Sequence, residues 1–211
     1  MHRTPFKNLV PAPPTLRLTE QQAALLVVDF QVFAADRSAG LGRLAAERGL
    51  EEELEEYYEQ VGCAQRNVQD LLTAFRARRL PVLYSRRVAG PGTAPPWVPT
   101  AEDTTASVVP ELTPVAGEVV VTRAATSPFA GGALDAAMTA AHVQSLVVVG
   151  LVLGGAVDCA VREAAEQGRA VVLVADACAA ETYTLHDCVS TQLGGGLVRV
   201  RSTDAVLAQL A

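Results

Sequence analysis

The chain has 211 residues, of which 50% are hydrophobic and 19% are charged, and its 23 acidic and 17 basic side chains give a formal net charge of -6. A domain of this size buries roughly 70% of the surface that its unfolded chain exposes, so it needs no disulfide or structural metal to fold. The acidic balance and the short Lys/Arg runs argue against a nucleic-acid partner. Four cysteines without CxxC spacing and only three histidines argue against a zinc site, so we expect neither a metal nor a cofactor.

The N-terminal sequence MHRTPFKNLVPAPP has four prolines and no apolar run, so it is typical of neither a signal peptide nor a membrane span. We expect residues 1–20 to form an N-terminal extension and residues 21–211 to form one domain, in a protein of the reducing cytoplasm with no membrane partner. Lys7 is the only lysine, so a mechanism that needs an amine from the core of the fold is excluded.

Apolar runs and helical stretches alternate along the chain. In chain order we predict a strand at 23–30, a helix at 51–79, strands at 81–85 and 118–122, a helix at 132–142, a strand at 145–150, a helix at 156–168, strands at 170–176 and 197–200, and a helix at 203–210. This alternation predicts a single doubly wound, Rossmann-like, three-layer α/β domain with a six-stranded, mostly parallel sheet. Residues 88–117, with six prolines and the single tryptophan, are predicted to form a long surface loop.

Ligands of such sheets bind beyond the carboxyl ends of the strands, where several polar residues of this chain are expected. Asp29 closes the first apolar run, where burial would raise its pKa and suit it to general acid or base chemistry. The alternative is that Asp29 caps a turn or pairs with an arginine. Arg86 and Arg87 follow the second strand. Arg123 follows the third strand and would bind a carboxylate, pair with Asp29, or remain solvated.

The sequence GLVLGGAV at 150–157 places two adjacent glycines between a strand and a helix. Such a turn lets backbone N–H groups face an anion or a developing oxyanion, although glycine-rich turns are common in α/β folds and neither a P-loop nor a dinucleotide spacing is present. Cys159 lies three residues into the helix, about 300° around the axis from Ala156, so a buried inert thiol is the favoured interpretation. The same interpretation applies to Cys178 and Cys188, and His186 is expected on a helix surface or in a cap.

Three stretches together resemble the isochorismatase-like (cysteine hydrolase) superfamily. They are LLVVDFQ, the series Arg123, Phe129 and Leu134, and VVVGLVLGGAVDCAVREAAEQGRAVVLVADACAAET. The resemblance extends to LGRLAAERGLEEELEEYYEQV, which is similar to helices of one branch of the superfamily, and to His186. It implies a Rossmann-like fold with six parallel strands.

The resemblance also implies positions for the hydrolytic Asp, Lys and Cys of the superfamily. The aspartate corresponds to Asp29, whereas the lysine position holds Arg123 and the nucleophile position holds Ala156. Isochorismatases proper also have a small residue in place of the cysteine and are thought to use the aspartate as a general acid on a vinyl ether, with water completing the cleavage. They keep the lysine, however, and Arg123 can orient an anion but cannot shuttle a proton. The threonine of the family turn is replaced by Leu153.

We therefore expect an isochorismatase-like enzyme without a cysteine nucleophile, acting on a small anionic or carbonyl-bearing metabolite by hydrolysis, elimination, or cyclisation or rearrangement. Such an activity would fit the biosynthesis of a specialised metabolite. Asp29 and Arg123 are the expected catalytic residues. The expected substrate-binding residues are Phe33, Arg87, Trp97, Phe129, Leu153, Gly154, Gly155 and Ala156. The alternatives are a non-catalytic binding or scaffold protein and an amidase that uses Cys159. The alanine-rich, half-hydrophobic composition predicts a homodimer or higher homo-oligomer.

Overall fold

The computed structural model describes residues 22–91, 94–194 and 196–210, together with Leu9, residues 12–13 and Leu18. The predicted N-terminal extension at 1–20 lies almost entirely outside the described residues. Six strands form one parallel sheet in the order β3-β2-β1-β4-β5-β6. They are β1 (Ala23–Val28), β2 (Val82–Arg87), β3 (Val119–Arg123), β4 (Ser145–Leu151), β5 (Ala170–Ala179) and β6 (Arg199–Arg201). The predicted six-stranded parallel α/β sheet is confirmed.

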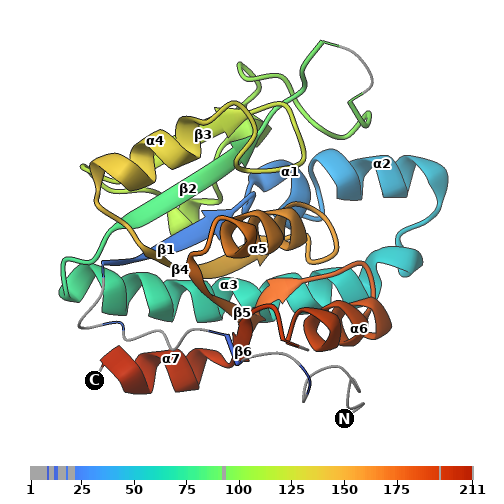
Figure 1. Cartoon of the computed structure of the whole chain (residues 1–211). Coiled ribbons are helices and arrows are strands. Elements are labelled where there is room, and N and C mark those ends of the chain that lie inside the picture. Colours follow the sequence, from blue (N-terminus) through green and yellow to red (C-terminus); the bar gives the residue numbers. More distant parts are fainter. Residues whose placement is uncertain are drawn as a thin grey trace.

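Helices cover both faces of the sheet (Figure 1). They are α1 (Val32–Ala35), α2 (Gly40–Arg48), α3 (Glu55–Ala77), α4 (Ala133–Ala140), α5 (Ala156–Glu166), α6 (Tyr183–Leu193) and α7 (Thr203–Leu210). The core against one face includes side chains of α3 and α7, and the core against the other includes side chains of α4, α5 and α6. This is the predicted three-layer architecture. Among the described residues, no helix is long and apolar enough to cross a membrane.

Strand β1 shows why the apolar runs predicted this fold. All six of its residues are buried. Successive side chains of a strand point to opposite faces, so alternate residues of β1 enter different cores. Leu25 and Val27 pack on the α3 side, whereas Leu26 and Val28 pack on the α4 and α5 side. A continuous apolar run without a polar face is what a central parallel strand requires.

Helix α6 was not among the predicted helices. Its sequence, YTLHDCVSTQL, has a weak apolar stripe, and only Val189 and Leu193 are buried. The helix begins because the Thr182 side chain accepts a hydrogen bond from the backbone N–H of Leu185, at 3.1 Å. The predicted helix at 51–79 is also divided, into a 3-10 helix (Glu52–Leu54) and α3.

The segment 88–117 differs from the predicted surface loop. It contains two 3-10 helices, Thr104–Ala106 and Pro110–Leu112, and the side chains of Ala106 and Leu112 have no exposed surface. Val108 also forms an antiparallel bridge with Gln31. The segment therefore packs its middle against the chain that leaves β1, and so lies beside the carboxyl end of the sheet.

Candidate active site

Asp29 and Arg123 form a buried ion pair at the carboxyl ends of the strands. Asp29 is the first residue after β1, and Arg123 is the last residue of β3. The Arg123 Nη1 atom donates to Asp29 Oδ1 at 2.7 Å, and Nη2 donates to Oδ2 at 2.8 Å. The Arg123 side chain is only 3% exposed and the Asp29 side chain only 8% exposed. Three alternatives were left open for Arg123: binding a carboxylate ligand, pairing with Asp29, or remaining solvated. The structure shows the pair with Asp29, and this contact spans the intervening strand β2.

The backbone of Asp29 turns sharply to make this contact. Its φ angle is +49°, in the left-handed region that few residues other than glycine and Asx residues adopt. Two backbone hydrogen bonds hold the turn: Asp29 N–H donates to Ser85 O at 2.9 Å, and Gln31 N–H donates to Asp29 O at 2.8 Å. Strain of this kind gathers at functional sites, where the surrounding structure holds it in place.

Arg87 adds a second guanidinium to the site. It ends β2 and lies opposite Arg123 in the parallel register. The Nε atoms of Arg87 and Arg123 are both buried and have no hydrogen-bond partner among the described residues. Arg123 binds the Asp29 carboxylate, and the charge of Arg87 also acts on it. A buried unsatisfied N–H group costs about 1–3 kcal/mol. This excess of positive charge and of donors suits the site to an anionic or carbonyl-bearing ligand.

The protonation of Asp29 depends on opposing effects. Burial raises the pKa of its carboxyl above the ordinary value, whereas the hydrogen bonds and charge of Arg123 and the charge of Arg87 act to lower it. The arginines therefore favour the ionised carboxylate, and any ligand that draws them away favours the protonated acid.

Gln31 is a site residue that the sequence reasoning missed. Its side chain has no exposed surface. Its Nε2 atom donates to Arg87 O at 2.8 Å and to Ala106 O at 2.7 Å, and its Oε1 atom accepts from Arg87 N–H at 2.7 Å. Gln31 thus ties the chain after Asp29 to the end of β2 and to the segment 88–117. The available signal was a lone amide within the otherwise apolar sequence after Asp29.

The turn between β4 and α5 lies beside Asp29, because Val28 and Gly150 are opposite each other in the sheet. A Cβ atom on Gly150 would collide with the backbone of Val28, and the φ angle of Gly150 is +129°, so this close approach requires glycine. The Gly155 N–H group donates to Val152 O at 2.9 Å, whereas the N–H groups of Gly154 and Ala156 have no backbone acceptor among the described residues. These two amides are available to an oxyanion at the start of α5.

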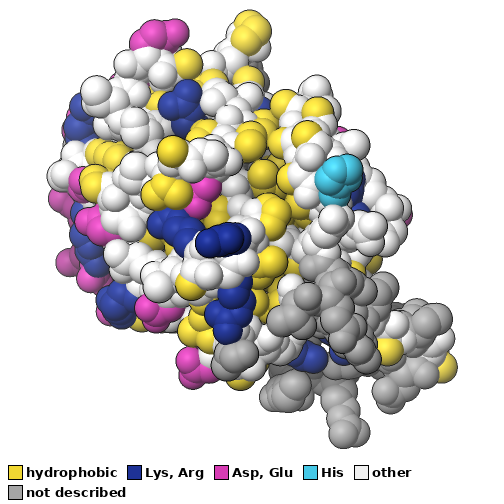
Figure 2. Space-filling view, turned by 90° about the vertical axis from the view of Figure 1, so that its left-hand side faces the viewer, with side chains coloured by type: hydrophobic (Ala, Val, Ile, Leu, Met, Phe, Trp, Pro, Cys, Tyr) yellow, Lys and Arg dark blue, Asp and Glu magenta, His cyan; other side chains and the backbone are white. Residues whose placement is uncertain are grey.

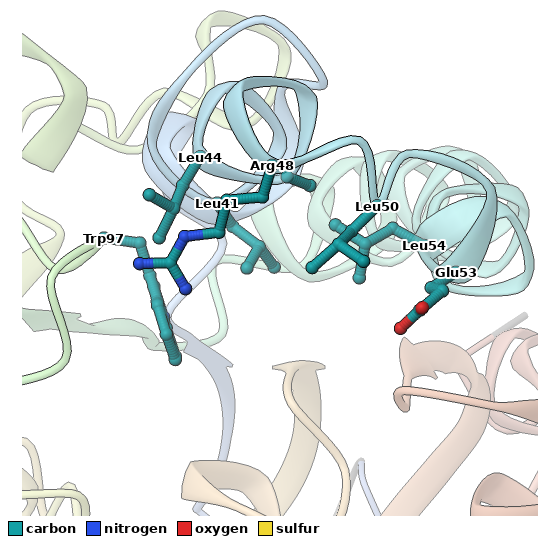
Figure 3. A pocket seen from close by; sticks show the side chains of 8 residues that line it. Leu41, Leu44, Arg48, Leu50, Glu53, Leu54 and Trp97 are labelled. Carbon is teal, nitrogen blue, oxygen red and sulfur yellow. The ribbon is translucent and has the colours of Figure 1, made fainter.

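The remaining predicted substrate-binding residues differ in their positions. Phe33 and Phe129 are each 5% exposed and belong to the cores on opposite faces of the sheet. Leu153 has no exposed surface, because it packs into the core between the sheet and helices α5 and α6. Contact of Leu153 with substrate stays a prediction, as it does for Phe33 and Phe129. Trp97 lies in an apolar pocket beside α2, whose lining includes none of the other expected site residues (Figure 3).

Three thiols were expected to be buried and inert. Cys178 is buried and Cys159 is partly buried, but Cys188 is exposed, so the expected burial is wrong for Cys188. Burial raises the pKa of the Cys159 thiol, and the charges of Asp158 and Glu163 raise it further. Burial raises the pKa of Cys178 to about 12. His186 Nε2 lies 2.9 Å from Ala175 O, a contact that holds α6 against β5. In the part of the chain that the structure describes, no group of three His, Cys, Asp or Glu side chains is placed to hold a metal.

A polar hollow lies at the opposite edge of the sheet, where β4 and β5 begin. Figure 2 views the molecule from the left of Figure 1 and shows acidic and basic side chains mixed over the left and centre of that face. The guanidinium of Arg169 in this hollow already binds Asp135 at 3.0 Å, Gln167 at 3.0 Å and Val143 O at 3.2 Å. Because the hydrogen-bond donors of Arg169 are already engaged, this edge offers fewer free donors to an anionic ligand than the edge at the carboxyl ends of the strands.

Comparisons with known proteins agree with the fold. The protein is similar to a cysteine hydrolase from Pseudomonas syringae pv. phaseolicola, with a TM-score of 0.79 and 20% identity over 95% of this chain and 97% of that one. An isochorismatase from Pseudomonas putida gives a TM-score of 0.76, with 21% identity over 97% and 99% of the two chains. In sequence, the chain is 26% identical over 172 residues to a secreted isochorismatase effector of Verticillium dahliae, covering 82% of this chain and 80% of the relative.

The sequence profile of the isochorismatase domain matches residues 23–205, which is most of the chain. This span begins with β1 and ends within α7, so it includes the whole sheet and every residue of the candidate site. The chain therefore belongs to the isochorismatase family.

Proposed function

We propose that this protein is an isochorismatase-family enzyme that works without a cysteine nucleophile on a small anionic or carbonyl-bearing organic metabolite. The observation that carries the proposal is the buried cluster of one carboxylate and two guanidiniums, Asp29, Arg123 and Arg87, with two unsatisfied Nε–H groups. Asp29 acts as the general acid or base. The arginines bind and orient the anionic group, and the amides at 154–156 contact a developing oxyanion.

Substrate binding and proton transfer are coupled in this arrangement. An anion that binds Arg123 and Arg87 competes with Asp29 for their charge, which removes the effects that oppose the rise of the Asp29 pKa. The buried carboxyl then takes a proton from water and donates it to the substrate. On a vinyl ether, the proton goes to carbon and water adds to the resulting oxocarbenium ion, returning a proton to the Asp29 carboxylate. The hemiketal so formed then breaks its C–O bond to give a carbonyl compound and an alcohol. Elimination and cyclisation or rearrangement begin with the same proton transfer.

The residues around the turn favour this chemistry over a cysteine amidase. Ala156 has no nucleophile at the position that the family resemblance assigns to one. Cys159 is the alternative, but its raised pKa leaves little thiolate near neutral pH. A non-catalytic scaffold would have no need for the left-handed backbone of the buried Asp29 or for the unsatisfied Nε–H groups of Arg123 and Arg87.

The test is a panel of carboxylate-bearing vinyl ethers, esters and amides, with products detected by liquid chromatography and mass spectrometry. For a compound that turns over, Asp29→Asn should lower kcat by about 10²–10⁴-fold, the usual loss when a general acid is removed. Cys159→Ala should keep the parent rate. Loss of activity in Cys159→Ala alone would favour the amidase, and an Asp29→Asn protein that is folded and fully active would remove Asp29 from the mechanism.

A further inference from the structure

A concave site lies beside helix α2, and we refer to it as the α2 pocket. Its volume is about 150 Å³. It is lined by Leu41, Leu44, Ala45, Arg48, Leu50, Glu53, Leu54 and Trp97. Figure 3 shows Trp97 on one side and Leu50 and Leu54 on the other. None of these residues belongs to the Asp29 cluster.

The end of α2 builds one wall of the α2 pocket. Gly49 ends the helix in the left-handed conformation, with φ of +67°, and Leu50 N–H then donates to Ala45 O at 2.9 Å. This turn directs the chain back, so that Leu50 and Leu54 face Trp97 across the pocket (Figure 3). Leu50 is 39% exposed and Trp97 is 36% exposed, so the apolar walls are in contact with solvent.

The size of the α2 pocket limits what it can hold. An apolar cavity of about 150 Å³ in another protein is known to take up benzene. The α2 pocket, at about 150 Å³ and walled by leucines and one indole, therefore has room for about one six-membered ring. Burying such a ring would cover apolar side chains that are now in contact with water.

The charges around the α2 pocket favour a ligand that carries a negative charge. Arg48 makes no side-chain hydrogen bond or ion pair with any residue in the described part of the chain, whereas Arg43 on the same helix lies 3.8 Å from Glu47. In Figure 3 the Arg48 side chain extends toward Trp97, and the Glu53 carboxylate lies at the other end of the pocket. An anionic group is thus attracted to the Trp97 end and repelled from the Glu53 end.

We propose that the α2 pocket binds a small organic anion, with a ring-sized apolar part between Trp97 and the leucines and the anionic group on Arg48. This site goes beyond the proposed function, because it needs no contribution from Asp29, Arg87 or Arg123. It gives the protein a second place for a hydrophobic carboxylate, independent of the chemistry at the strand ends.

Trp97 is the only tryptophan in the chain, so intrinsic tryptophan fluorescence reports directly on this pocket. The full-length protein is titrated at constant ionic strength with benzoate, with toluene as the ring without the charge, and with acetate as the charge without the ring. We expect a saturable change with benzoate, a weaker response with toluene, and none with acetate. A benzoate titration that leaves the fluorescence unchanged, or an acetate response equal to that of benzoate, would overturn the proposal.

Two arginine variants on the same helix separate specific binding from general electrostatics. Arg48→Gln should weaken benzoate binding about five-fold, or about 1 kcal/mol at 1.4 kcal/mol per tenfold, and leave the toluene response unchanged. Arg43→Gln makes the same change of charge outside the pocket and should leave both responses unchanged. Equal weakening by the two variants would refute the role of Arg48. Loss of the benzoate response in Asp29→Asn would place the ligand at the strand ends instead and so overturn the second site.

Discussion

Replacing Arg123 with methionine would remove the cation from the buried pair while keeping a side chain of similar length. Asp29 would lose both hydrogen bonds from Arg123, at 2.7 and 2.8 Å, and would remain buried with only the hydroxyl of Ser85 at 3.4 Å and the charge of Arg87. Removing one partner of a buried ion pair typically costs about 3–5 kcal/mol. At about 2–4 °C per kcal/mol for a domain of this size, the melting temperature should fall by about 6–20 °C.

The same substitution should make stability depend on pH, with a sign that follows from the Asp29 pKa. Burial already raises this pKa, and Arg123 is the first of the groups that oppose the rise, so its removal raises the folded pKa further. An acid whose folded pKa exceeds its unfolded value favours folding below the unfolded pKa, and this contribution is lost as the pH rises through the folded pKa. Arg123→Met should therefore lose stability with rising pH by up to about 1.4 kcal/mol per pH unit in that window, more than the parent does.

The assay is urea unfolding of the parent and the variant at several pH values between about 4 and 8, a window that begins near the ordinary carboxyl pKa and extends above it. The matched control is Arg37→Met. Arg37 also donates two hydrogen bonds to one carboxylate, that of Glu55, at 2.7 and 3.0 Å. In this pair, however, the Arg37 side chain is 53% exposed and the Glu55 side chain is 56% exposed. Solvent already screens that pair, so its loss should cost far less. Equal destabilisation by the two variants, or an Arg123→Met protein without added pH dependence, would refute the reasoning.

Three further results are expected. At pH 8 iodoacetamide should label the exposed Cys63 and spare Cys178, whose pKa is raised to about 12, and peptide mass spectrometry that finds equal labelling would contradict this. Gly150→Ala should cost about 2–6 kcal/mol, because a methyl group would meet the backbone of Val28 in a strained conformation; a urea midpoint equal to that of the parent would speak against this close approach. Light scattering should give a mass at least twice that of the 22.1 kDa chain, and a single-chain mass at micromolar concentration would rule out the predicted homo-oligomer.

The sequence by itself determined the sheet and the positions of the chemistry. Strands β1 and β4 are buried on both faces, so their unbroken apolar runs could be read locally, and the polar residue that follows β1 had to lie at an edge of the sheet. Asp29 and Arg123 were therefore identified as candidates from their places after apolar runs alone. The alternation of these runs with helical stretches was enough to predict a parallel sheet covered on both faces.

Tertiary structure alone decided how those residues meet. Asp29 and Arg123 are 94 positions apart, and their contact depends on the strand order and on a left-handed turn at Asp29, neither of which leaves a local pattern. The same holds for Gln31, whose side-chain amide bonds to backbone groups 56 and 75 positions away. It also holds for Trp97, which was expected in the substrate site but lies in the pocket beside α2. Periodicity reports which side chains are buried, because burial has the repeat of the helix or strand. It does not report which buried groups become neighbours, since that depends on contacts between distant segments.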